Sequence, residues 1–439
     1  MPPIRTEGPA AKRPQTKIPA LVMRHTIILA LSQALVGMGT QLVPTLGPLL
    51  SVELLGSAAL AGAGISIVGM SRLIIAYPLG KLMDIYGRRA GLLLGLAVAI
   101  VGTLLTGLSV IWHSLPVFVI GMLIFGMGMG AAQQLRLAAS DMYPPSRRAE
   151  GLGYVLTGSL LGALGAPVVV SVAQAITPGL GVPPLATPWL IVPAVILPSL
   201  VLISFMRPDP KEIGEHLERY YPGYKPDLPA KVAGPTSAGA QVSAGRFPRQ
   251  VAFVSSFAAQ GTMSMVMVMT SLALAHHGHE LPAISLSVSI HVIGMFGFSI
   301  PLGRLGDAVG RRSILVAGSI IGVLGTLLVP FSSEYWVITL GTFLVGLGWS
   351  CVNVASTAVI ADTTQANVRG RAIGKNDALA SAAGIVLPLI SGPLVDSFGL
   401  NSVGVLGIVL MALPLPLLLR LSEPSPGKYG DAIPAPEKV

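Results

Sequence analysis

The chain has 439 residues, of which 52% are hydrophobic and only 11% are charged, and its mean hydropathy is +0.74. Soluble domains usually carry about 25% charged residues, so this composition excludes an ordinary soluble protein. The net charge of +9 would suit a nucleic-acid-binding protein, but the sequence shows no basic face with aromatic or polar readers. The single cysteine excludes an internal disulfide.

Residues 1–25 are rich in proline and basic side chains and lack the apolar core of a signal peptide, so they are expected to form a cytoplasmic tail. Apolar runs of roughly the 20 residues that a helix needs to cross a bilayer follow. We predict an all-α integral membrane protein with twelve transmembrane helices. The predicted spans are 26–50, 58–80, 90–110, 115–142, 150–176, 187–206, 250–275, 281–302, 313–331, 335–360, 372–395 and 401–420.

Lysine and arginine are unevenly placed between these spans. Of the 28 basic residues, five lie in the N-terminal tail and seven in 207–249, and none lies in a loop that joins an odd span to the next even one. Cytoplasmic loops are enriched in Lys and Arg, so both termini are expected in the cytoplasm and the protein in the cell (inner or plasma) membrane. The expected domains are two six-helix halves, 26–206 and 250–420, a cytoplasmic linker, 207–249, and a C-terminal tail, 421–439.

A motif near the end of the second span recurs near the end of the eighth. "YPLGKLMDIYGRRAGLLLG" at 77–95 returns as "IPLGRLGDAVGRRSILVAG" at 300–318, an offset of 223. A weaker repeat pairs "SRRAEGLGYV" (146–155) with "NVRGRAIGKN" (367–376), an offset of 221. This period predicts two pseudo-symmetric halves. The matched motif residues are Gly80, Asp84, Gly87, Arg88 and Arg89, and Gly303, Asp307, Gly310, Arg311 and Arg312.

The repeated G-x-L-x-D-x-x-G-R-R motif resembles the signature of the major facilitator superfamily, and the resemblance covers the whole chain. It implies alternating access, with a site near the membrane midplane between the halves. The glycines permit a tight turn, and the acids and arginines would hold the cytoplasmic side closed in one state. No nucleotide-binding loop is present, so a gradient must drive transport. Neither an enzyme activity nor a cofactor is expected.

The stretch "MSMVMVMT" (263–270) places Met263 and Met267 on one helix face, and His291 and Met295 share a face of the next span. Thioether and imidazole ligands select Cu(I) over hard cations, and a histidine inside a membrane suggests a functional site. Two alternatives stay open. The methionines could be packing or an adaptable cavity wall, and the histidine could be hydrogen-bonded to a neighbouring helix.

The spacing M-x-x-x-M, followed 28 residues later by H-x-x-x-M, resembles the CcoA-like bacterial copper importers, a branch that also contains riboflavin-type carriers. Segments "RPDP" (207–210), "HGH" (277–279) and "GW" (348–349) are also similar to that branch. The resemblance implies copper, moved inward, as the substrate. The alternatives are a proton-coupled transporter of a small organic compound (drug efflux or vitamin uptake) and a facilitator-fold scaffold that transports nothing. A monomer with no partner besides substrate and lipid bilayer is expected.

Further side chains are candidates for roles in the same site. His276, His277 and His279 at the outer mouth would capture a cation, or they are a polar helix end. Cys351, in span 10, would add a thiolate, or it is inert.

Two charged residues inside the spans are also candidates. Arg136 would pair with an anionic substrate or with an acid of the opposite half. Asp377 would load and release a proton, with its pKa raised by desolvation, or it is an acid favoured by a helix N-terminus.

Overall fold

The computed structural model describes residues 17–222, 224, 246–364 and 366–421. The predicted tails at 1–16 and 422–439 and the linker segment 225–245 lie outside the described residues. Within the described ranges the chain is helical with no strand, and 12 helices are long and apolar enough to cross a membrane. The predicted all-α fold with twelve spans is confirmed. The observed spans are Ala20–Leu55, Ala58–Tyr86, Arg88–Ile111, Leu115–Asp141, Glu150–Leu180, Thr187–Ser204, Arg246–His276, Leu281–Val309, Arg311–Leu328, Tyr335–Asp362, Val368–Phe398 and Leu400–Leu419.

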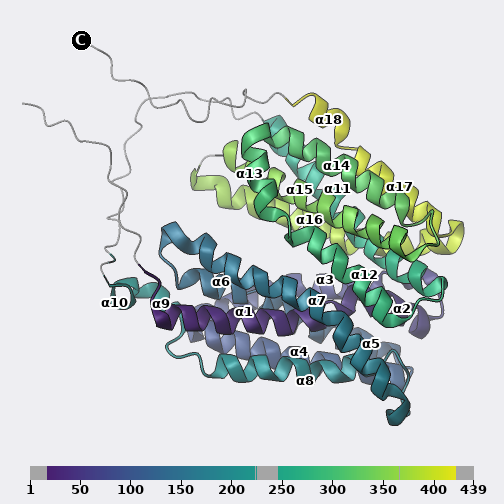
Figure 1. The fold of residues 1–439 in the computed structure, drawn as a ribbon, viewed down its shortest axis with the longest axis horizontal. Coiled ribbons are helices and arrows are strands. Elements are labelled where there is room, and N and C mark those ends of the chain that lie inside the picture. The colour runs from purple at the N-terminus through teal and green to yellow at the C-terminus, as the bar shows by residue number, and fades with distance from the viewer. Residues whose placement is uncertain (1–16, 223, 225–245, 365, 422–439) are drawn as a thin grey trace, which may run out of the picture.

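The helices form two halves that are joined on one side of the molecule (Figure 1). The N-terminal half comprises α1 (Ala20–Thr40), α2 (Leu42–Leu55), η1 (Ala58–Leu60), α3 (Ala63–Tyr86), α4 (Arg88–Ile111), α5 (Leu115–Ala132), α6 (Leu135–Asp141), η2 (Pro145–Arg147), α7 (Arg148–Leu180) and α8 (Thr187–Ser204). The C-terminal half comprises α11 (Arg246–His276), α12 (Leu281–Phe296), α13 (Ser299–Val309), α14 (Arg311–Leu328), α15 (Tyr335–Asp362), α16 (Ala366–Phe398), α17 (Leu400–Ala412) and α18 (Leu415–Leu419).

Five of the spans are interrupted where the sequence predicts continuous helices, among them the second, between η1 and α3, and the twelfth, between α17 and α18. The first breaks between α1 and α2 at Gln41, and the eighth breaks between α12 and α13. Thr40, the last residue of α1, and Gly297, the first residue after α12, lie four residues before Pro44 and Pro301. The ring of a proline clashes with the carbonyl of residue i−4, and its nitrogen has no hydrogen to donate to that carbonyl. The fourth span breaks between α5 and α6, with no proline to account for it.

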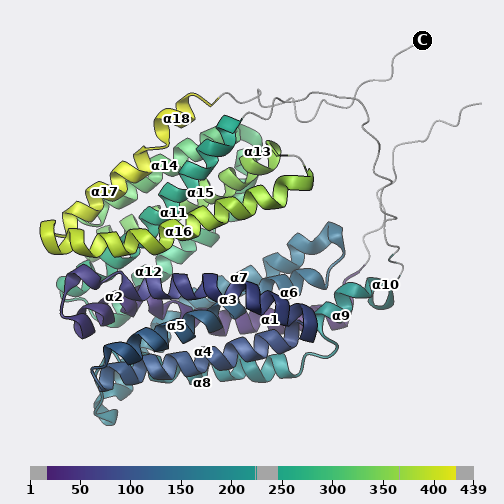
Figure 2. The same cartoon turned by 180° about the vertical axis from the view of Figure 1, so that it is seen from behind.

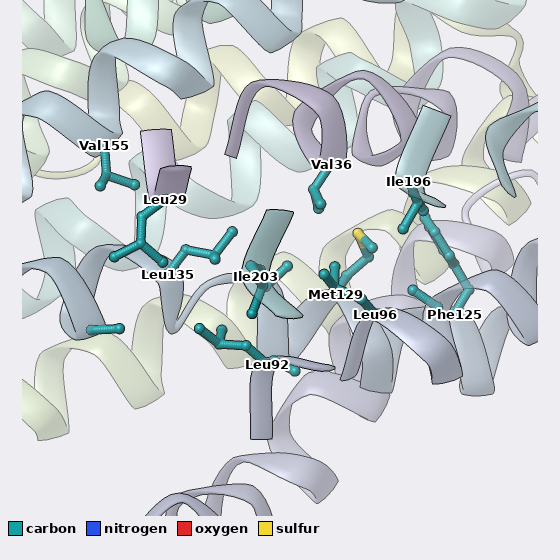
Figure 3. Packing of buried hydrophobic residues seen from close by; sticks show 14 of the residues in the cluster. Leu29, Val36, Leu92, Leu96, Phe125, Met129, Leu135, Val155, Ile196 and Ile203 are labelled. Atoms are coloured by element: carbon teal, nitrogen blue, oxygen red, sulfur yellow. The ribbon is translucent and has the colours of Figure 1, made fainter. Parts of the chain in front are cut away.

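The core of the N-terminal half forms between α1, α4, α5 and α8, and Figure 3 shows part of it. The crossing is close because glycines face it: a Cβ at Gly102 would lie 2.2 Å from the backbone nitrogen of Phe125. Small residues allow membrane helices to approach in this way. The buried side chains shown are Leu29 and Val36 of α1, Leu92 and Leu96 of α4, Phe125 and Met129 of α5, Leu135 of α6, Val155 of α7, and Ile196 and Ile203 of α8.

The first part of the predicted linker is folded against the N-terminal half. It contains α9 (Pro210–Glu215) and α10 (Leu217–Tyr220). Ile213 and Tyr221 are fully buried in the core, and the Tyr221 hydroxyl donates a hydrogen bond to the carbonyl oxygen of Met142 at 3.0 Å. The structure therefore differs from the predicted linker 207–249 at both ends, because α11 also begins earlier, at Arg246.

The two halves converge at one end of the bundle and diverge at the other (Figures 1 and 2). We call the end that carries α9 and α10 the linker side, and the end that carries η1 and residues 277–280 the opposite side. Toward the opposite side, α2 packs on α11 and α12, α7 packs on α12, and α16 packs on α3 and η1. At the linker side α6 and α13 lie apart (Figure 1).

Candidate functional site

A cavity of about 580 Å³ lies between the two halves. Its wall includes residues of spans 1, 4, 7 and 10, together with residues of spans 2, 8 and 11. The deepest side chains are buried, whereas Gln133 and Asp377 on the wall are exposed. The cavity is therefore a chamber between the halves whose wall is most exposed to solvent toward the linker side.

The structure brings the four predicted methionine and histidine residues together on this wall. Met263 and Met267 come from α11, and His291 and Met295 come from α12. Met267 and His291 are 5% and 2% exposed. The intervening Met265 faces the opposite way and is fully buried in a hydrophobic cluster, which agrees with the predicted helix faces.

His291 is held in one orientation by a single hydrogen bond. Its Nδ1 lies 2.7 Å from the carbonyl oxygen of Thr342 on α15. A carbonyl only accepts, so Nδ1 carries the proton, and the lone pair of the neutral ring is on Nε2. The backbones approach closely here, because a Cβ at Gly346 would lie 2.4 Å from the His291 carbonyl oxygen. His291 can therefore offer Nε2 as an acceptor or as a ligand.

The cavity wall carries the guanidinium of Arg72 on α3. The Nε of Arg72 is buried and has no hydrogen-bond partner among the described residues, and Arg72 has no ion pair there either. The side-chain nitrogen of Gln41 on the same wall is also buried and unpartnered. Arg136 lies on α6 outside the cavity lining, and its Nε donates to the Gln133 carbonyl oxygen at 3.4 Å. The predicted role of Arg136, pairing with an anionic substrate or with an acid of the opposite half, remains a prediction.

Asp377 lines the cavity but is exposed, on the fourth turn of α16. Its role in loading and releasing a proton remains a prediction. Deeper in the site, Trp349 of the "GW" segment donates from Nε1 to Oε1 of Gln260 at 2.9 Å. This bond fixes the orientation of a cavity-lining amide from a neighbouring helix.

The other predicted ligands do not join the site. Cys351 is 2% exposed and packs toward α14, where a Cβ at Gly318 would lie 2.6 Å from its own Cβ. The rings of His276 and His277 meet edge to face at the surface, while His279 packs on Tyr335. Over the described ranges, no group of three or more His, Cys, Asp or Glu residues is placed to hold a metal ion. The outer capture site and the Cys351 thiolate ligand remain predictions.

The repeated motif forms the same arrangement in both halves. Nε of Arg88 lies 2.8 Å from Oδ2 of Asp141, and its Nη1 lies 3.7 Å from Oδ1 of Asp84. In the second half, Arg311 reaches Asp307 at 2.5 Å and Asp362 at 3.5 Å.

Gly87 and Gly310, at the turns of this motif, have φ values of 91° and 95°. Only glycine adopts these readily. Among the described residues, the ion pairs of Arg88 and of Arg311 each stay within one half. Closure of the linker side by this motif remains a prediction.

Sequence reasoning missed three acids that complete this arrangement. Asp141 and Asp362 end spans 4 and 10 and differ by the repeat offset of 221. Asp209 of the "RPDP" segment accepts hydrogen bonds from the backbone nitrogens of Arg88 and Arg89 at 3.0 and 2.9 Å. The signal was present in the offset and in the Asp-Pro pair, which is typical of a helix start.

Three serine hydroxyls join the two halves, and we call them the serine seal. Ser66 donates to the Ile385 carbonyl oxygen, Ser271 to that of Pro44 and Ser289 to that of Ala163, each at 2.6 Å. All three serines are at most 3% exposed. Glycines allow the helices to meet at this end: a Cβ at Gly62 would lie 1.9 Å from the Pro388 carbonyl oxygen. The cavity is thereby closed toward the opposite side.

Known proteins resemble this chain over nearly its full length. The family model of the Major Facilitator Superfamily matches residues 29–226 and 252–438. The uncharacterized MFS-type transporter YdeG of Bacillus subtilis (strain 168) is 28% identical over 91% of this chain and 92% of its own. The riboflavin transporter RfnT of Brucella anthropi is 25% identical over 91% of this chain and 96% of its own. A crystal structure of nucleoside transporter NupG, 13% identical, superposes with a TM-score of 0.64 over 91% of this chain and 98% of its own.

Proposed function

The chain belongs to the Major Facilitator Superfamily, and from that membership we propose that it is a secondary transporter that moves a small organic solute by alternating access. The structure would be one of its two end states, with the cavity accessible from the linker side. A non-transporting scaffold is disfavoured, because the space between the halves is an open chamber of about 580 Å³ and is not filled by bulky side chains.

The observation that carries the choice of substrate class is the unpartnered guanidinium of Arg72. A buried cation without a partner is costly, so such groups mark sites where a ligand supplies the counter-charge. Gln41 offers a second unpartnered donor on the same wall. Together they favour a solute with an anionic or strongly polar oxygen. The methionines would form an adaptable apolar surface against the rest of the molecule.

The riboflavin-transporting relative supports this class of solute. Riboflavin combines carbonyl oxygens, which accept hydrogen bonds, with a planar ring system. Those two features suit the donors of Arg72 and Gln41 and the thioethers of Met263 and Met267. We therefore choose riboflavin as the first probe, without assigning it as the physiological substrate.

Copper is the second candidate, because Met263, Met267, His291 and Met295 line one cavity and Nε2 of His291 is free to bind. Arg72 argues against it. At about 1.5 Å per residue, Arg72 and His291 lie at similar depths, nine residues into α3 and ten into α12. The guanidinium of Arg72 on the same cavity wall would repel a Cu(I) ion and weaken its binding.

Arg72→Gln separates the two candidates, because it acts on them in opposite directions. In proteoliposomes, we expect this variant to lose uptake of the organic probe, while the Met263→Leu/Met267→Leu double variant keeps most of it. If copper is the cargo, the double variant loses Cu(I) uptake and Arg72→Gln raises it. Arg304→Gln is the matched control, since Arg304 is exposed and outside the cavity. Equal uptake of riboflavin and other organic probes by the wild type and by Arg72→Gln would contradict the proposed site.

We also propose that the linker side faces the cytoplasm of a cell (inner or plasma) membrane. The distribution of Lys and Arg supports this orientation, since the described linker-side loops hold the basic residues between spans. A fluorescent protein fused to the C-terminus should then mature and fluoresce, whereas an alkaline phosphatase fusion at the same position should be inactive. The reverse pattern would overturn the orientation.

A further inference from the structure

A second hollow lies on the linker side, between the first turns of α11 and α16, and is separate from the central cavity. Its volume is about 310 Å³. Its wall carries four cationic side chains and no acidic one among the described residues: Arg246, Arg249, Arg371 and Lys375. We call it the basic pocket.

The cations of the basic pocket are not neutralised by the protein. None of the four has an ion pair with any residue that the structure describes. The Lys375 ammonium lies 5.8 Å from the ring centroid of Phe253, which favours a cation but does not cancel its charge. Like charges lining one hollow repel, so an external anion would relieve the repulsion.

The backbone and a buried hydroxyl add to the same preference. α11 and α16 are 31 and 33 residues long and both begin at this pocket. The positive dipole end of a helix start attracts anions. Thr364 lines the pocket, is 6% exposed, and its hydroxyl has no hydrogen-bond partner in the described chain. A buried hydroxyl without a partner is costly, and an oxygen of a bound anion would satisfy it.

The other half of the molecule provides an internal comparison. The repeat offset of 221 pairs Thr364 with Tyr143, Arg371 with Glu150 and Lys375 with Tyr154. In the N-terminal half Glu150 accepts a hydrogen bond from Nε of Arg147 at 2.8 Å, and the Tyr143 hydroxyl bonds that of Thr26 at 3.0 Å. The N-terminal half therefore has an acid, Glu150, at this place, and the hydroxyl of Tyr143 is hydrogen-bonded. In the C-terminal half Arg371 stands where Glu150 stands in the first half, and the hydroxyl of Thr364 has no partner among the described residues.

We propose that the basic pocket binds a phosphate-bearing anion. Arginine pairs with phosphate through two parallel hydrogen bonds, and lysine adds a point charge. Two sources share this chemistry: the headgroup of an anionic phospholipid in the adjoining leaflet, and a soluble phosphate. The proposal does not depend on which solute the central cavity carries.

The test uses the purified full-length chain. Binding of inorganic phosphate is measured in detergent without lipid, and retention of phosphatidylglycerol against phosphatidylcholine is measured by native mass spectrometry. One basic side chain near a phosphate-rich surface contributes about a fivefold change in affinity, so Arg249→Gln/Arg371→Gln should weaken binding by about 25-fold. Thr364→Val should weaken it about fivefold. Phosphate binding identifies a soluble ligand, and binding of phosphatidylglycerol alone identifies a lipid.

The matched control is Arg304→Gln/Arg420→Gln. It removes the same charge from exposed positions outside the pocket. It should leave both affinities unchanged, and equal melting temperatures should show that all variants fold. The proposal is overturned if inorganic phosphate does not bind and phosphatidylglycerol is not retained in preference to phosphatidylcholine. It is also overturned if the control and pocket variants lose binding equally.

Discussion

The wall of the central cavity carries two charged groups, the guanidinium of Arg72 and the carboxylate of Asp377. The two groups occupy different environments. Arg72 has a buried, unpartnered Nε, whereas Asp377 is exposed. A fixed buried charge suits recognition of a solute. An exposed carboxylate that would become enclosed when the linker side closes suits loading and release of a proton.

Asp377→Asn should therefore abolish uptake driven by a pH gradient and leave solute exchange at equal pH intact. The amide keeps the size of the side chain but cannot release a proton. The measurement is uptake of a labelled solute into proteoliposomes with and without a pH gradient. Asp396→Asn, an exposed position near the end of α16 outside the cavity, is the control. A gradient-driven rate that survives in Asp377→Asn would remove this residue from the coupling mechanism.

Among the elements, the start of α4 depends on a residue far away in sequence. Asp209 accepts hydrogen bonds from the backbone nitrogens of Arg88, Arg89 and Lys211, so one carboxylate caps both α4 and α9. Gly87 leaves room for it, because a Cβ there would lie 2.5 Å from Oδ2 of Asp209. The cap connects the end of the first copy of the repeated motif, at Arg88 and Arg89, to the segment that follows span 6.

Asp209→Ala should lower the stability of the chain by about 1–2 kcal/mol, the usual cost of losing a helix cap. The readout is the thermal unfolding midpoint in detergent, together with the rate of proteolysis after residue 206. Asp396→Ala, which removes an exposed acid from the last turns of α16, should leave both unchanged. Equal midpoints for Asp209→Ala and wild type would show that the cap contributes no net stability.

The crossing of α12 and α15 controls the position of His291. In Gly346→Ala, the new methyl group would meet the His291 carbonyl oxygen at 2.4 Å, so the helices must separate. Overpacking of this kind costs about 1–3 kcal/mol, and we expect lower stability and slower transport. Gly153→Ala has no atom within 4 Å of the new group and should be neutral or slightly stabilising. Unimpaired transport by Gly346→Ala would mean that the crossing tolerates adjustment.

The sequence alone predicts the spans well because each is an apolar run, and it predicts the shared wall of Met263, Met267, His291 and Met295 because four-residue spacing fixes a helix face. It fails where the answer depends on a tertiary partner. Cys351 could face either way around span 10, and only the packing against Gly318 decides. The exposure of Asp377 depends on how far apart the halves stand, which is not a local property.

At the scale of the whole molecule, the serine seal and the glycine contacts near it hold the halves together toward the opposite side. Each hydrogen bond contributes about 1 kcal/mol net, so the three bonds stabilise this conformation by about 3 kcal/mol. That is enough to change the ratio of two conformations by about two orders of magnitude.

The triple variant Ser66→Ala/Ser271→Ala/Ser289→Ala should therefore shift the population away from the linker-side-open state. Asn353 lines the cavity and is exposed, so an Asn353→Cys reporter should react with a maleimide applied from the linker side. Cys351 is buried and needs no replacement. We expect slower labelling in the triple variant, and no change with Ser171→Ala, whose hydroxyl bonds only within α7. Unchanged labelling in the triple variant would contradict the role of the seal.

The serine seal has one more consequence, because it is made of neutral donors and acceptors. Dissolved ions screen charges over about 8 Å at physiological ionic strength, but they leave a buried hydroxyl–carbonyl bond nearly untouched. The linker side, in contrast, is built on arginine–carboxylate pairs such as Arg88–Asp141 and Arg311–Asp362. A change in salt concentration would therefore act on these linker-side pairs and spare the seal. Such a carrier would keep its closed face closed while the ionic composition of its surroundings varies.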